Sequence, residues 1–124
     1  MRRGFSSVVP ELLKLADFCL AHPDLSGYFE LNINCPCSSR NDVFANIVGN
    51  LPCMIDTSPP YVRLKWEVCK FSTYIVYGEP QYFGTCVDEE SAVQQPDYLG
   101  KFGDSHFTLD PFIRSSLTGG YKYE

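Results

Sequence analysis

The first third of the chain changes from a helical to a strand-like pattern of hydrophobic residues. Apolar residues recur at helical spacing and predict a helix from about Val8 to Ala21. The members of this apolar stripe are Leu12, Leu15, Ala16, Cys19 and Leu20. Because Pro23 restricts the backbone of His22, the helix should end there. The residues from Tyr28 to Cys35 then alternate between apolar and polar, as a strand covered on one face does.

The middle of the chain predicts one more helix and three more strands. The helix should follow a cap at Ser39 or Asn41, and its apolar positions are Val43, Phe44, Ile47, Val48 and Leu51. The strands are expected at Val62–Val68, Phe71–Tyr77 and Tyr82–Val87, with the first two paired as a hairpin. A helix between the first two predicted strands permits a right-handed crossover.

These elements predict an α+β fold, in which two helices pack on one face of a three- to four-stranded mixed sheet. The apolar stripe of the first helix should be buried against the sheet face that carries Leu31, Ile33, Leu64 and Trp66. A chain of 124 residues is long enough for one hydrophobic core and too short for two.

The regular pattern stops after Val87, and this predicts a division of the chain. Residues 1–87 are expected to form a single α+β domain, and residues 88–124 an extended C-terminal arm. The arm is unusually aromatic for a linker, since it contains Tyr98, Phe102, Phe107, Phe112, Tyr121 and Tyr123. Because tyrosine and phenylalanine supply much of the energy of protein interfaces, these six residues are predicted to bind a partner.

The charge distribution argues against nucleic acid as the main ligand. Residues 1–87 carry 7 positive and 8 negative side chains, and residues 88–124 carry 3 and 7. Such a chain offers no basic surface to neutralise a phosphate backbone. The N-terminal helix is interrupted by charges, unlike a signal peptide, and no uncharged run approaches the length of a membrane span. We therefore expect a cytoplasmic protein without a membrane partner.

Six cysteines permit a metal or a disulfide interpretation, but core packing accounts for them more simply. They are Cys19, Cys35, Cys37, Cys53, Cys69 and Cys86. The Cys35–Cys37 pair would need two further zinc ligands, and no CxxC or histidine pair follows at the required spacing. Without an export signal, disulfides are also disfavoured. The prediction is six reduced cysteines, no bound metal and no cofactor.

The sequence contains no motif for nucleophilic catalysis. A cysteine or serine nucleophile needs a neighbouring base, and the chain has only two histidines, His22 and His106. His22 lies at the end of the predicted helix, where its interaction with the helix dipole is a sufficient role. His106 lies in the predicted arm. We therefore expect no catalytic residues and a protein that is not an enzyme.

The segment LLKLADFCLAHPDL, followed by an alternating strand and later by WEVCKFSTYIVY, resembles a group of small uncharacterised proteins of bacteriophages and actinobacterial mobile elements. Those proteins often carry a LADFLxAHPDLP-like helix ahead of a strand. The resemblance covers about the first two thirds of the chain, and it implies a phage or mobile-element origin without implying any activity.

The sequence as a whole predicts a non-enzymatic protein that acts by stoichiometric protein binding. Its most plausible use is the inhibition or redirection of a host protein, as in counter-defence, within the host cytoplasm. The alternative is a structural accessory of a virion or other large assembly, in which the C-terminal arm laces onto neighbouring subunits. Both hypotheses leave the oligomeric state open.

Overall fold

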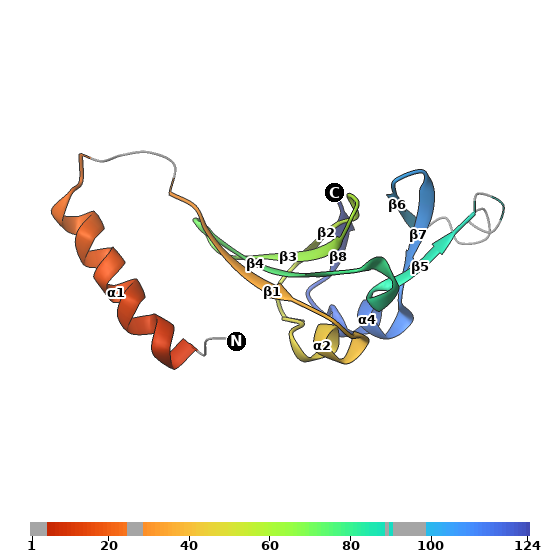
Figure 1. The fold of residues 1–124 in the computed structure, drawn as a ribbon, viewed down its shortest axis with the longest axis horizontal. Helices are drawn as coiled ribbons and strands as arrows, with labels where there is room; N and C mark the ends of the chain where they lie inside the picture. Colours follow the sequence, from red (N-terminus) through yellow and green to blue (C-terminus); the bar gives the residue numbers. More distant parts are fainter. Residues whose placement is uncertain (1–4, 25–28, 89, 91–98) are drawn as a thin grey trace.

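A five-stranded sheet forms the centre of the computed structural model, which describes residues 5–24, 29–88, 90 and 99–124 (Figure 1). The strand order is β1-β4-β3-β2-β8. The strands are β1 (Leu31–Pro36), β2 (Cys53–Asp56), β3 (Val62–Cys69), β4 (Ser72–Gly78) and β8 (Tyr121–Tyr123). The sheet is mixed, because β1 runs parallel to β4 and β8 runs parallel to β2, while the other pairs are antiparallel.

A second, antiparallel sheet and short helices complete the fold. The sheet has the order β5-β7-β6, formed by β5 (Gly84–Val87), β6 (Leu99–Phe102) and β7 (Ser105–Leu109). The described helices are α1 (Phe5–Ala21), α2 (Arg40–Ala45), the 3-10 turn η1 (Pro80–Tyr82) and α4 (Pro111–Ser116). Figure 1 shows α2 and α4 on the same side of the five-stranded sheet. The α+β class predicted from the sequence is therefore correct.

The hydrophobic core lies between one face of the five-stranded sheet and the segments that cover it. Along β3, the buried Val62, Leu64 and Trp66 alternate with more exposed residues, as the period of a strand requires. The covering residues come from α2, β7, α4 and the residue that follows η1, and include Val43, Phe83, Phe107, Leu109 and Ile113. We call the buried side of this sheet its core face and the opposite side its outer face.

Helix α2 begins where the sequence predicts, because Ser39 caps it. The Ser39 side chain accepts a hydrogen bond from the Asp42 N–H at 3.2 Å, which satisfies one of the unpaired donors of the first turn. The helix ends at Ala45, earlier than its apolar pattern predicts. Ile47, Val48 and Leu51 follow it and still pack against the core. These residues are therefore apolar because they contact the core, although the helix does not extend to them.

Three features of the sheets differ from the prediction. The strand β2 was not predicted, since its four residues are too short to give a clear period. The predicted edge strand at Tyr82–Val87 becomes β5, which pairs with β7 in the second sheet. The crossover from the first strand does not lead to β3, because β1 lies beside β4. Each difference depends on pairing between distant segments, which local periodicity does not encode.

The predicted burial of the first helix against its own sheet is wrong. Helix α1 ends at Ala21 as predicted, but all of its residues from Ser6 onward are exposed except the half-buried Val8. Leu12 and Leu15 keep more than a third of their surface in solvent. Figure 1 shows α1 separated from the sheet. Leu64 and Trp66, the expected contacts of α1, are covered by other parts of the chain.

The predicted extended aromatic arm is also wrong, because residues 99–124 are part of the core. Strand β8 extends the five-stranded sheet at the β2 edge, where the Cys53 N–H donates to the Gly120 carbonyl at 2.9 Å. Asp110 caps α4 by accepting from the Phe112 N–H, and its carboxylate lies 2.8 Å from Arg40 of α2. The core therefore extends well past residue 87, where the hydrophobic pattern appeared to stop.

Two phenylalanines in this region provide a matched test. Phe107 is 0% exposed and Phe112 is 72% exposed. Replacement of a fully buried phenylalanine by alanine lowers the free energy of unfolding by about 3–5 kcal/mol. Replacement of an exposed phenylalanine changes it by no more than about 0.5 kcal/mol. We expect Phe107→Ala to lower the free energy of unfolding by that larger amount, measured by urea denaturation. The control Phe112→Ala should leave it nearly unchanged, and equal effects of the two variants would contradict the burial described above.

Candidate functional site

The outer face of the five-stranded sheet is the best candidate for a binding surface. Strand alternation that buries Leu64 and Trp66 directs Arg63, Lys65 and Glu67 to this face. No described helix covers it in Figure 1. The outer face therefore combines a rigid backbone with side chains that are accessible to a partner.

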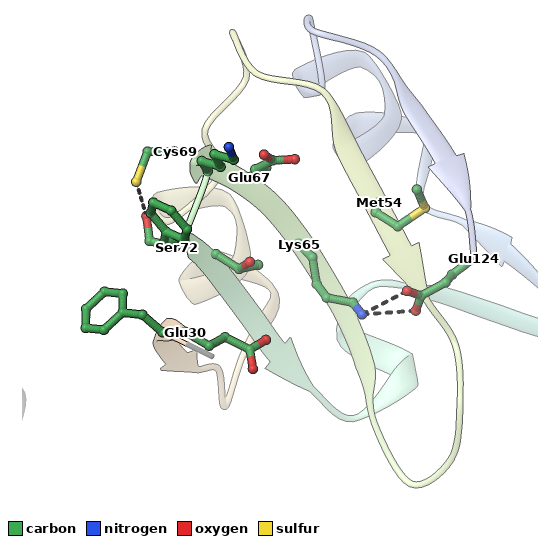
Figure 2. Close-up of a pocket in the computed structure, with 11 residues that line it drawn as sticks. Glu30, Met54, Lys65, Glu67, Cys69, Ser72 and Glu124 are labelled. Atoms are coloured by element: carbon green, nitrogen blue, oxygen red, sulfur yellow. Dashed lines mark hydrogen bonds and ion pairs between the residues drawn. The ribbon is translucent and has the colours of Figure 1, made fainter. Parts of the chain in front are cut away.

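A cleft of about 950 Å³ lies on this face, at the end where the β3–β4 hairpin closes (Figure 2). Its apolar lining comes from Phe29, Met54 and Phe71. The rings of Phe29 and Phe71 meet edge to face, with 6.3 Å between their centroids. This geometry is a favourable one for aromatic pairs, and it joins the segment before β1 to the hairpin.

One side of the cleft is an ion-pair network centred on Lys65. Its Nζ lies 3.0 Å from a carboxylate oxygen of Glu124 and 3.6 Å from one of Asp56. Burial works against ionisation of Asp56, but hydrogen bonds from Ser58 and the positive charges of Lys65 and Arg63 hold its pKa below the ordinary value. The network links β2 and β3 to the residue after β8, and it leaves Lys65 already neutralised.

The other side of the cleft carries two exposed carboxylates. Glu30 and Glu67 line the cleft, and neither forms an ion pair with another described residue. Lys70 also lines it, with its Nζ 5.9 Å from the centroid of the Phe71 ring. This part of the cleft can therefore accept a basic group without displacing an existing partner.

Cys69 is the most chemically distinctive side chain of the cleft. Its sulfur lies 3.0 Å from Ser72 Oγ, across the end of the hairpin. A hydrogen bond from the Ser72 hydroxyl stabilises the thiolate and lowers the pKa of Cys69. By contrast, burial raises the pKa of Cys53 on the core face to about 12. Neither His22 nor His106 is among the described residues that line the cleft with Cys69.

The six aromatic residues predicted to bind a partner occupy different environments. Phe107 is fully buried, and Phe102, Tyr121 and Tyr123 pack partly buried against the core. Burial raises the pKa of the Tyr123 phenol to about 12, and the nearby Tyr121 adds to this effect. Phe112 is exposed on α4, and Tyr98 lies outside the described residues. These residues therefore do not form one common binding surface.

The cysteines and histidines are likewise dispersed. Of the six cysteines, Cys37 and Cys53 are buried, Cys35 is half-buried, and Cys19, Cys69 and Cys86 are exposed. The Cys37 sulfur lies 3.9 Å from the Cys35 carbonyl oxygen. Within the described ranges, no group of three or more His, Cys, Asp or Glu side chains could hold a metal ion. The His22 ring packs against Phe18 on α1, and His106 lies half-buried on β7.

Sequence reasoning missed the cleft because its residues come from distant segments. The alternation of Arg63, Lys65 and Glu67 indicated a solvent-facing side of the sheet, and this was the available signal. It gave no sign that Glu30 and Met54 would join them, since β2 was not predicted and the pairing of β1 with β4 was not foreseen.

Comparison of the chain with known proteins assigns no function to the cleft. The chain matches no family model, no curated protein and no solved structure. Among the helices that the structure describes, none has the length and apolar character of a membrane span.

The two contrasting thiols predict an order of chemical modification. In the native protein at neutral pH, iodoacetamide should alkylate Cys69 well before Cys53, because the thiolate is the reactive form and Cys53 is both buried and neutral. Peptide mass spectrometry measures the rate at each site. Ser72→Ala should slow the alkylation of Cys69 by removing the hydrogen bond, whereas Ser115→Ala, on α4, should not. Alkylation of Cys53 ahead of Cys69 would contradict this account.

Proposed function

We propose that this protein acts by stoichiometric protein binding through the cleft on the outer face, and that it catalyses no reaction. The observation that carries the proposal is the combination of apolar and acidic groups in one accessible cleft. Phe29, Met54 and Phe71 give the cleft an apolar lining, and Glu30 and Glu67 offer carboxylates without an ion-pair partner among the described residues. Such a lining suits a protein segment that presents an aliphatic side chain next to lysine or arginine.

The edge of the sheet supports the same function. Leu31 N–H donates to the Phe71 carbonyl and Cys37 N–H to the Tyr77 carbonyl, so the odd-numbered residues of β1 direct their backbone toward β4. By the alternation of a parallel ladder, Asn32 and Asn34 direct their backbone groups away from β4, at the edge of the sheet. An extended segment of a partner can add there as a further strand, with side chains reaching the cleft beyond Glu30.

The biological setting of the proposal comes from the resemblance of the N-terminal segment to phage and mobile-element proteins. In that setting, the partner is a host protein of the bacterial cytoplasm, and binding inhibits or redirects it. The alternative role, a structural accessory of a virion or other assembly, relied on an extended C-terminal arm. It loses that support, because Phe107 is buried and Tyr121 and Tyr123 belong to a strand of the main sheet.

Charge reversal in the cleft tests the proposal. The partner is first identified by affinity capture from host lysate and mass spectrometry, and its Kd for the full chain is then measured by calorimetry. The double variant Glu30→Lys with Glu67→Lys should raise the Kd at least tenfold, which corresponds to about 1.4 kcal/mol. The reason is repulsion of the basic group that the carboxylates would otherwise attract.

A double variant with the same charge change outside the cleft provides the control. Glu79 and Asp104 are exposed and do not line the cleft, so Glu79→Lys with Asp104→Lys should leave the Kd unchanged. An unchanged Kd for the cleft variant would refute this binding site. Recovery of the protein in purified virions would favour the structural alternative, whereas an inhibitor should be absent from particles.

A further inference from the structure

The apolar side of α1 faces solvent from Val9 to the end of the helix at Ala21. Leu13 is 62% exposed and Leu20 is 80% exposed, and Val9 is about half exposed. A helix that is polar on one side only is normally held against a partner surface by its apolar side. Helix α1 has no such surface among the described residues of its own chain, so its amphipathic pattern lacks an explanation within one copy.

The core face of the five-stranded sheet has an uncovered end. Strand β3 is buried on this face as far as Trp66, and all of its residues beyond Trp66 are exposed. Val68 lies at the β-bulge between Glu67 and Cys69, at this same end of the sheet, and is 51% exposed. On the neighbouring part of the sheet, Leu31 and Ile33 of β1 share the face of Tyr74 and are only half-buried. We call Leu31, Ile33 and Val68 the sheet-end patch.

We infer that two copies of this chain form a symmetric dimer by exchanging α1. In this arrangement, the apolar side of each α1 docks on the sheet-end patch of the other copy. Each chain carries both halves of the contact: a helix whose apolar side is exposed, and an apolar sheet end that the described residues cover only in part. Exchange of an identical element between two protomers closes under two-fold symmetry, so the assembly stops at the dimer.

The area of the contact favours a reciprocal exchange over the docking of one helix alone. A helix of 17 residues is about 25 Å long and about 10 Å wide, so docking it removes roughly 500 Å² of total surface from solvent. That area lies in the range of non-specific crystal contacts. Two exchanged helices double it to roughly 1,000 Å², which reaches the lower range of specific interfaces.

The chain between the helix and the sheet is long enough for this exchange. Helix α1 ends at Ala21 and β1 begins at Leu31, so nine residues separate them. Fully extended, a segment of this length spans about 30 Å. Docking of α1 on its own sheet is the competing arrangement, and it differs from exchange because it cannot depend on protein concentration.

Two double variants, each of which introduces two glutamines into α1, test the dimer. Leu12→Gln with Leu20→Gln disrupts the apolar side of α1. Lys14→Gln with Asp17→Gln changes the polar side, and both variants leave the net charge unchanged. The mass of the full chain in solution is measured by sedimentation over a range of concentrations. We expect a dimer of twice 14.0 kDa for the wild type and for the polar-side variant.

The apolar-side variant should raise the dimer Kd at least about tenfold, by removing buried leucine contacts. Cys19 lies in the apolar stripe and is exposed in the single chain, so it offers an internal probe. Its alkylation should slow as wild-type concentration rises, because the dimer covers it, and this protection should be lost in the apolar-side variant.

Three results would overturn the inference: a monomeric wild type at high micromolar concentration, a dimer that the apolar-side variant leaves intact, or protection of Cys19 that is independent of concentration. The last result would assign α1 to its own sheet. None of these results depends on the cleft residues Glu30 and Glu67, so the dimer and the proposed binding function can fail separately.

Discussion

Contact between the five-stranded sheet and residues 99–124 is the interaction on which the rest of the structure depends. This segment supplies Phe107, Leu109 and Ile113 to the core and β8 to the edge of the sheet. The half-exposed Arg40 and the buried Asp110 join α2 to the start of α4, so the two helices that cover the core face are held together. A charged pair of this kind, with one member buried, stabilises chiefly by avoiding an unpaired carboxylate.

Coverage of only one face has consequences for function. The helices and strands that cover the sheet all pack on its core face. The charged and apolar side chains of the outer face therefore stay accessible, including those of the cleft beside Lys65. The cover of β3 also ends at Trp66, which leaves the sheet-end patch partly exposed. A sheet covered in this way has two accessible surfaces of different character. One is the cleft with its apolar and acidic lining, which is the proposed site for a basic segment, and the other is the apolar sheet end, which is the proposed site for α1 of a second copy.

The sequence predicted those elements that local physics determines. The proline at position 23, the Ser39 cap and the alternation of Val62–Val68 each act within a few residues, and α1, α2 and β3 follow from them. The aromatic residues of the C-terminal segment were misjudged because Gly100, Gly103 and Pro111 interrupt their spacing. Gly100 instead lies within β6 and Pro111 begins α4, while Gly103 adopts a positive φ of 63° in the turn between β6 and β7. The cleft depends on strand order, which no local pattern encodes.

Removal of the C-terminal segment tests this account most directly. Trp66 is the sole tryptophan, and it is fully buried, so its fluorescence reports the state of the core. A chain ending after Glu90 loses β6, β7, α4 and β8. We expect this shorter chain to show the red-shifted emission of a solvent-exposed tryptophan and no cooperative thermal transition. A shorter chain that melts cooperatively with the emission of the full chain would contradict the central role of residues 99–124.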